Sequence, residues 1–193
     1  MEIIDRLDKI DEKIRKKDFM ENKGLGNEVG YYVFDYDAED ELIVRNYLDK
    51  YIKNFNDQMH DISIKSFDLY DIFIDYIDNE GFLETIYEME EEDGFDYVQD
   101  VLTDLFQMDS DEDNYIVNYI IENTPEDCVV FISGIGKIYP FIRSHIILNK
   151  LHLVFDRVPV VLFYPGRYDG NTLILFSEFE DNNYYRAFPL VVR

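Results

Sequence analysis

The chain has 193 residues, of which 47% are hydrophobic, and this excludes a disordered acidic tail and indicates one domain with a sizeable core. The formal net charge of −24 is concentrated in residues 1–127, which hold 37 Asp and Glu against 11 Lys and Arg, whereas residues 128–193 hold 5 against 7. Such a field repels nucleic acid and anionic membrane and favours a basic partner, so we expect no general role in direct nucleic-acid binding.

The rest of the composition argues against export, membrane insertion and metal binding. The N-terminus is charged from its second residue, and no run of 18 apolar residues occurs, so we expect neither a signal peptide nor a transmembrane helix. The single cysteine, Cys128, lies in an apolar run and is typical of a small core residue in a reducing compartment. The three histidines do not stand at metal-ligand spacing. We therefore expect a cytoplasmic protein with no cofactor and no metal.

The first third of the chain predicts two helices and a strand. Residues 2–17 repeat Ile and Leu at the spacing of an amphipathic helix. Residues 31–34 are typical of a short strand. Asp37 is a good N-cap for a second helix that runs to about Phe55, and the acidic residues after it suit the first turn of a helix.

The middle third predicts a strand followed by an acidic helical insert. Residues 62–67 alternate with period two, as a half-buried strand does, and Asp68 can cap the helix that follows. Because no linker interrupts the chain, we expect one α/β domain over residues 1–193, with a helical subdomain at roughly 68–123 inside it. The helices of this insert are expected at residues 69–79, 82–92, 96–107 and 112–122.

The last third is organised around a strand, a glycine turn and a helix. Residues 128–132 form a continuous apolar run that ends at Gly134, which is typical of a strand buried on both faces. The residues after Pro140 have the spacing of a buried helix. Strand, turn and helix form the unit from which parallel sheets are built, so we expect an α/β fold with a mainly parallel sheet flanked by helices. Further strands are expected at residues 159–164 and 172–176, with an edge strand at 184–190.

The turn after this strand is a candidate phosphate-binding loop. Ser133, Gly134, Gly136 and Lys137 place two glycines and a lysine near a helix N-terminus, an arrangement that can cradle phosphates. A P-loop, however, also needs a glycine five places before Gly136 and a Ser or Thr after the lysine, and this chain has Phe and Ile at those positions. The alternative is that the two glycines only permit a tight turn from strand to helix.

Two further groupings of polar residues do not complete a catalytic site. Ser133 and His145 suggest a hydrolase, but the nucleophile elbow G-x-S-x-G is absent. Asp35 and Asp37 follow a strand, where metal-binding acids often lie, but an active magnesium site needs a further acid, for which Asp169 is the candidate. A cap and a turn explain both carboxylates without metal. We therefore expect no catalytic residue and no enzymatic activity.

Positive charge and tyrosine gather near the C-terminal turns. Candidate residues for a partner contact are Arg143, Arg167, Tyr168, Tyr184 and Tyr185, because exposed Tyr and Arg often dominate binding energy. The alternative is that the basic residues of this third pair with the acidic body of the same chain.

Three blocks of the sequence together point to one family. They are NKGLGNEVGYYVFDYDAEDEL, SGIGKIYPFIRSHIILNKL and VVLFYPGRYDGNTLILFSEFEDNNYYRAF. With these blocks the chain resembles the BrxB family, a component of bacterial BREX phage-defence systems. The insert matches that family only in its acidic, helical character.

The resemblance implies a cytoplasmic protein that works with other BREX members. These are the AAA-type ATPase BrxC, the adenine-specific DNA methyltransferase PglX and the phosphatase-superfamily protein PglZ. The resemblance supplies no catalytic residues, so the first hypothesis is a non-catalytic adaptor that binds PglZ and, as a second partner, BrxC. One alternative is a nucleotide- or phosphate-binding subunit that uses the Gly134–Lys137 loop. The other is an acidic DNA mimic that occupies a basic groove.

Overall fold

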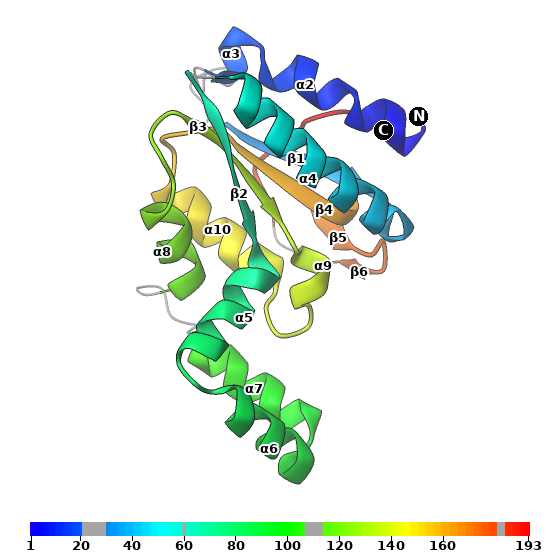
Figure 1. Ribbon diagram of the computed structural model, residues 1–193. Coiled ribbons are helices and arrows are strands. Elements are labelled where there is room, and N and C mark those ends of the chain that lie inside the picture. The colour runs from blue at the N-terminus through cyan, green and yellow to red at the C-terminus, as the bar shows by residue number, and fades with distance from the viewer. Residues whose placement is uncertain (21–29, 60, 107–113, 181–183) are drawn as a thin grey trace.

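The chain forms a sheet with helices on both faces (Figure 1). The computed structural model describes residues 1–20, 30–59, 61–106, 114–180 and 184–193. The strands are β1 (Tyr31–Tyr36), β2 (Ser63–Asp68), β3 (Cys128–Ser133), β4 (Val160–Tyr168), β5 (Leu173–Leu175), β6 (Phe179–Glu180) and β7 (Phe188–Pro189). The helices are α1 (Ile3–Leu7), α2 (Lys9–Ile14), α3 (Lys17–Met20), the 3₁₀ turn η1 (Ala38–Asp40), α4 (Glu41–Gln58), α5 (Leu69–Asn79), α6 (Leu83–Asp93), α7 (Phe95–Leu105), α8 (Tyr115–Glu122), α9 (Ile135–Ile138) and α10 (Ser144–Val154).

The sheet is mainly parallel, as predicted. Its strands lie in the order β2-β3-β4-β1-β7, and every neighbouring pair in that order is parallel. An antiparallel hairpin of β5 and β6 joins the sheet through the last residues of β4. The carboxyl ends of β1, β2 and β3 therefore meet at one edge of the sheet, where polar side chains from different parts of the chain come together.

The core has two halves, one on each face of the sheet. Along β3, Val129 and Phe131 face one half, and Val130 and Ile132 face the other. Helices α1, α2 and α4 cover the first half, and α5, α7, α8, α9 and α10 cover the second. Because successive side chains of a strand point to opposite faces, a strand covered on both sides has an unbroken apolar sequence, as the run at residues 128–132 predicted.

The helical insert differs in burial along its length. Helices α5, α7 and α8 place Ile72, Val98 and Ile116 in the same core half as the strands. Helix α6, by contrast, has no buried residue. Helices α6 and α7 form a hairpin that projects away from the sheet, at the bottom of Figure 1, and we call it the acidic hairpin (Leu83–Leu105). Residues 107 and 112–113 of the predicted helices lie outside the described residues.

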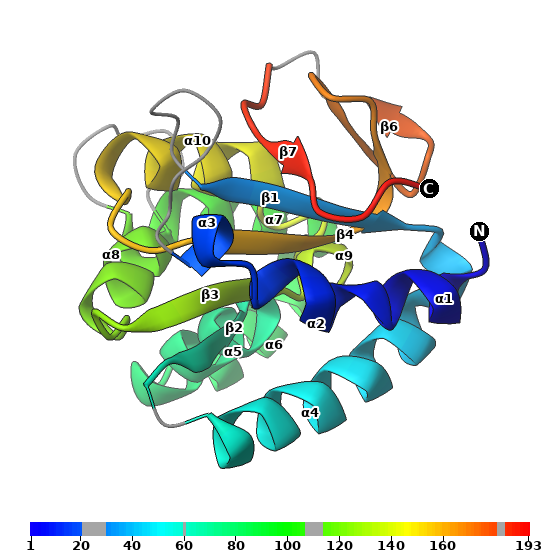
Figure 2. The same ribbon diagram turned by 90° about the horizontal axis from the view of Figure 1, so that it is seen from above.

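Several element boundaries differ from the sequence-based prediction. The first helix is interrupted near Asp8 and again before Lys17, although it still buries the predicted Ile and Leu face. Strand β4 continues to Tyr168, where a loop was predicted, because Gly166–Tyr168 pair with β5. The edge strand β7 spans only Phe188–Pro189, and proline cannot donate to a longer ladder. Seen from above, the two chain termini lie side by side (Figure 2).

Candidate functional site

Packing requires a glycine at position 134 of the candidate phosphate loop and leaves little room for a side chain at position 136. Gly134 has a φ of 81°, which an L-residue rarely adopts, and a Cβ there would overlap the Asp68 carboxylate. At Gly136 a Cβ would lie 3.0 Å from the ring of Phe176 and 3.1 Å from Pro165. These contacts support the interpretation of the loop as a tight strand-to-helix turn.

The lysine of the loop is engaged within the chain. Its Nζ lies 2.6 Å from Oδ2 of Asp68 and 3.3 Å from Oδ1 of Asp71, and 5.2 Å from the ring centroid of Tyr70. The other Asp68 oxygen accepts hydrogen bonds from the first backbone N–H groups of α5, so the predicted cap is confirmed. A phosphate at Lys137 would have to compete with two carboxylates.

A cavity of about 370 Å³ lies at the carboxyl ends of β2 and β3, beside α4. Its wall includes Ser133, and it holds more carboxylates than cations, so its electrostatics oppose an anionic ligand. Phosphate binding by the loop stays a prediction. The charged residues of the wall are Glu41, Asp49, Asp68, Asp71, Arg45 and Lys137.

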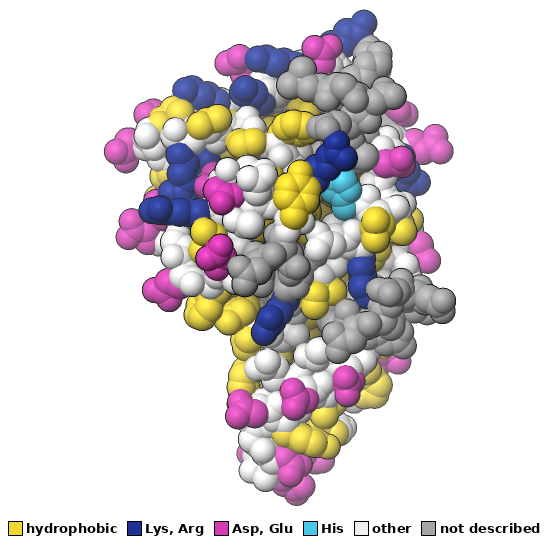
Figure 3. Space-filling model, turned by 180° about the vertical axis from the view of Figure 1, so that it is seen from behind, with side chains coloured by type: hydrophobic (Ala, Val, Ile, Leu, Met, Phe, Trp, Pro, Cys, Tyr) yellow, Lys and Arg dark blue, Asp and Glu magenta, His cyan; other side chains and the backbone are white. Residues whose placement is uncertain are grey.

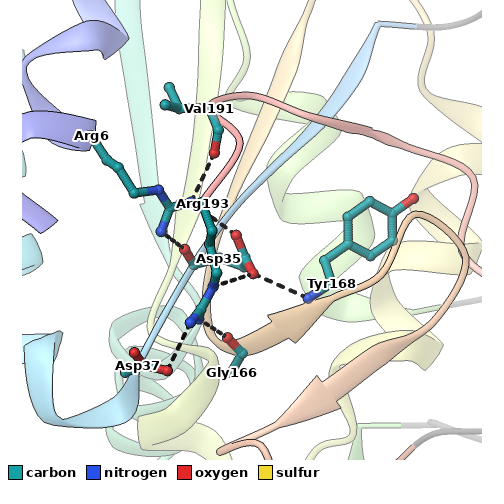
Figure 4. A network of polar contacts seen from close by, with 7 residues as sticks. All are labelled: Arg6, Asp35, Asp37, Gly166, Tyr168, Val191 and Arg193. Atoms are coloured by element: carbon teal, nitrogen blue, oxygen red, sulfur yellow. Dashed lines mark hydrogen bonds and ion pairs between the residues drawn. The ribbon is translucent and has the colours of Figure 1, made fainter. Parts of the chain in front are cut away.

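Asp35, within β1, and Asp37, directly after it, belong to an ion network that is buried at Asp35 and exposed at Asp37 (Figure 4). Asp35 is 7% exposed and accepts from Arg6 at 2.9 Å and from Arg193 at 2.9 Å. Arg6 also donates to the Val191 carbonyl at 2.8 Å. We call Arg6, Asp35, Asp37 and Arg193 the terminal ion network, because it ties the first helix, β1 and the last residue of the chain together. Burial lowers the pKa of Arg6, and Asp35 opposes that effect.

Asp37 occupies the N-cap position of η1, the turn that leads into α4, but its side chain does not act as the predicted cap. The Asp37 side chain makes no capping hydrogen bond and pairs instead with Nη1 of Arg193 at 2.9 Å. Arginine is the preferred partner here because its planar group can bridge two carboxylates and the Gly166 carbonyl, 2.7 Å away, at once. Among the described residues no group of three His, Cys, Asp or Glu is placed to hold a metal ion. The side chain of His145, the candidate partner of Ser133, lies outside what the structure describes.

The C-terminal candidate residues separate into buried and exposed groups. Tyr185 is 2% exposed and lies in the core, so its ring is not offered to a partner, contrary to the prediction. Tyr168 is half-buried, and its hydroxyl lies 2.9 Å from the Tyr185 carbonyl and 2.8 Å from the Ala187 carbonyl, either of which can accept its one O–H. Burial raises its pKa to about 12. Tyr184, Arg143 and Arg167 are exposed and remain candidates for a partner contact.

The acidic hairpin is the surface that the sequence-based candidates missed. Residues 66–136 contain 21 Asp and Glu and no Lys, Arg or His. Three aromatic side chains of the hairpin are nonetheless exposed to water: Tyr87 by 58%, Phe95 by 42% and Tyr97 by 47%. On the face in Figure 3, Asp, Glu and hydrophobic side chains cover the lowest part of the molecule, and Lys and Arg lie only above it. The absence of cations was visible in the sequence, whereas the exposure of the rings was not.

No helix in the described part of the chain is both long enough and apolar enough to cross a membrane.

Comparisons with known proteins agree on one family. A family model described as "BREX protein BrxB" matches residues 65–190. The chain is 43% identical over 192 residues to the BREX protein BrxB of Bacillus cereus (strain H3081.97), over 98% of this chain and 97% of that protein. It is 31% identical over 186 residues to the BREX protein BrxB of Escherichia coli O9:H4 (strain HS), over 96% of this chain and 90% of that protein. No solved structure matches the chain. The chain therefore belongs to the BrxB family of BREX proteins.

Proposed function

We propose that this chain is a non-catalytic adaptor subunit of a cytoplasmic BREX anti-phage defence complex, in which it binds PglZ and the BrxC ATPase. The observation that carries the proposal is the acidic hairpin, which projects from the sheet with Tyr87, Phe95 and Tyr97 exposed and with no basic residue of its own. Exposed aromatic groups with a polar rim are typical of protein–protein interaction sites.

The charges at the strand ends support a role other than catalysis. Lys137 is paired with Asp68 and Asp71, and Asp35 is paired with Arg6 and Arg193. Ion pairs of this kind hold elements of a fold together. The charge of the hairpin, by contrast, has no basic partner within residues 66–136.

The hairpin would combine two kinds of attraction. Its carboxylates would speed the encounter with a basic surface and select against acidic partners. Its aromatic rings would supply most of the binding energy once water is excluded, since Tyr is enriched among residues that cost about 2 kcal/mol or more on truncation. Binding should therefore weaken as salt rises without being abolished.

The first experiment is co-elution of the full chain with PglZ of the same BREX system on a sizing column, at low and at high salt. A complex at low salt that partly dissociates at high salt is expected. If neither PglZ nor BrxC co-elutes at either salt concentration, the adaptor proposal is overturned and a nucleotide screen becomes the next step.

A set of variants then tells the two candidate surfaces apart. The double variant Tyr87→Ala, Tyr97→Ala is expected to weaken the complex at least tenfold, because both rings leave the proposed contact. The double variant Arg167→Ala, Tyr184→Ala tests the C-terminal turn. Leu153→Ala, an 84% exposed position on α10, is the control. If only the C-terminal variant weakens binding, the adaptor function stands but its surface is the turn and not the hairpin.

A further inference from the structure

A groove of about 540 Å³ lies at the base of the acidic hairpin, where α5, the end of α7 and α8 meet. It is distinct from the cavity beside Lys137, with which it shares no residue. Its wall is mainly aromatic and polar, and the residues that line it are Tyr76, Leu105, Phe106, Tyr115, Asn118, Tyr119, Glu122 and Asn123.

The aromatic rings of the groove are set at angles to one another. The ring centroids of Tyr76 and Tyr115 are 4.2 Å apart, with their planes at 49°. Phe106 closes the bottom, with its centroid 5.1 Å from that of Tyr76, and it is only 1% exposed. Tyr119 follows Tyr115 at 6.1 Å. Rings tilted in this way present faces as well as edges, and the face of an aromatic ring attracts a cation.

The charge around the groove is negative. Glu122 is part of the wall, and among the residues that the structure describes no Lys or Arg lines the groove. Asp75 and Glu80 lie close enough to act on Tyr115: burial first, and then the neighbouring tyrosines and these two carboxylates, raise the pKa of its hydroxyl. Arg157, near the end of α8, is held by the carbonyls of Ile121 at 2.6 Å and Thr124 at 2.7 Å. The groove therefore has the aromatic and acidic components of a cation site, and its wall supplies no cation.

The cavity beside Lys137 also combines carboxylates with a tyrosine ring, and these groups surround a cation. There a cation of the chain itself lies between two carboxylates and 5.2 Å from the ring centroid of Tyr70. The groove repeats the tyrosine and the carboxylate without the cation. This comparison points to a cation from outside the chain.

We propose that the groove binds the guanidinium group of an arginine on the partner protein, and this rests on the proposed adaptor function. A guanidinium group is planar, so it can stack on the ring of Tyr76 or Tyr115, and the carboxylate of Glu122 on the same wall adds negative charge that attracts it. The groove and the aromatic rings of the hairpin share helix α7, so a partner bound along α7 reaches both.

The groove is tested first without any partner. The full chain, with its tyrosine rings labelled with carbon-13, is titrated with N-acetyl-arginine methylamide while the ring signals are followed by NMR. Saturable shifts of Tyr76 and Tyr115 are expected, and the citrulline analogue, which has the same shape without the charge, should produce at least fivefold smaller shifts. Equal shifts with both compounds, or shifts spread over all tyrosines, would overturn the proposal.

Variants connect the groove to the complex. Tyr115→Leu removes the ring face and Glu122→Gln removes the exposed carboxylate, and each is expected to weaken both the arginine titration and the PglZ complex about fivefold. Phe179→Leu, at a 47% exposed aromatic position on β6, is the matched control. Glu122→Gln keeps the inference testable if Tyr115→Leu does not fold.

The two proposals can fail separately. A wild-type chain that binds no BREX partner but still binds arginine overturns the adaptor function and leaves a cation site. A complex that forms normally with both groove variants, in a chain whose tyrosines do not respond to arginine, overturns only the groove.

Discussion

The terminal ion network and the acidic hairpin use charge in opposite ways. In the network, Asp35 is buried between two arginines, and each of its oxygens accepts a hydrogen bond from one of them. In the hairpin, carboxylates lie beside exposed tyrosines, and no basic residue occurs anywhere between residues 66 and 136. Charge in the first region holds the chain ends to the sheet, and charge in the second belongs to the surface that we propose for a partner contact.

Because of this difference, we expect substitutions in the network to affect folding and substitutions in the hairpin to affect binding. A buried charge that loses its partner is costly because it has no water to replace that partner. An exposed carboxylate or ring has water around it already, so its removal changes the free energy of unfolding little. Substitutions in both regions test this division.

Asp35→Ala should be the most destabilising change in the two regions compared. It leaves the buried Arg6 without its carboxylate, and the expected loss in the free energy of unfolding is about 3–5 kcal/mol. Asp37→Ala is the matched control, because the Asp37 side chain is 50% exposed and its ion pair should contribute about 1 kcal/mol or less. Urea denaturation measures both. A midpoint for Asp35→Ala equal to that of the wild type would show that the buried pairing of Asp35 does not stabilise the fold.

Gly134→Ala should destabilise the fold by about 2–3 kcal/mol. A Cβ at this position meets the Asp68 carboxylate and also forces an L-residue into the left-handed region. Gly94→Ala, at the turn of the acidic hairpin, is the comparison, since Gly94 has a φ of 85° but nothing within 4 Å of its Cβ position. Only the backbone strain remains there, at about 1 kcal/mol. A larger loss for Gly94→Ala would contradict the packing role of Gly134.

Tyr87→Ala should change the free energy of unfolding by less than about 0.5 kcal/mol, because the ring is exposed. Tyr31→Ala is the opposite case: that ring is fully buried, and its hydroxyl donates to the Phe155 carbonyl at 2.7 Å. Its loss should cost about 3–5 kcal/mol. Thermal unfolding compares the two, and a strongly lowered melting temperature for Tyr87→Ala would assign the hairpin rings a structural role.

The smallest expected effect is the reaction of Cys128 with a thiol reagent at pH 8. Burial raises the pKa of Cys128 to about 11 and covers the sulfur, so the thiol stays protonated and out of reach in the folded chain. The thiol introduced by Tyr87→Cys should react at once. The rate of reaction with Ellman's reagent measures the accessibility of each thiol. Rapid labelling of Cys128 in the native wild type would show that the core at β3 opens.

The sequence was sufficient for the elements whose signals are local. The apolar run at residues 128–132 predicted a strand covered on both faces, and Asp68 was correctly expected to cap α5. The periodicity of residues 69–79 predicted that helix with its observed bounds. The glycine turn after β3 was also recognisable, because glycine is the usual residue where the backbone turns tightly or approaches another group closely.

The candidate site was only partly predictable, because exposure depends on distant residues. Tyr184 and Tyr185 are neighbours in the sequence, yet one is 63% exposed and the other 2%. Nothing in the local sequence explains this difference in exposure. It arises because helix α10 and strand β1 pack on Tyr185. The groove at the base of the hairpin forms where α5, α7 and α8 pack together, and no sequence motif within any one of these helices predicts it.

The class of fold followed from the periodicity of apolar residues, and the family followed from blocks of sequence. The uneven distribution of charge followed from composition. Only the tertiary structure decided which charges are neutralised. Asp35 and Arg193 are 158 residues apart and pair because the sheet brings the end of β1 and the chain terminus together. Ion pairing and burial are properties of neighbours in space, so they became visible only once the sheet was formed.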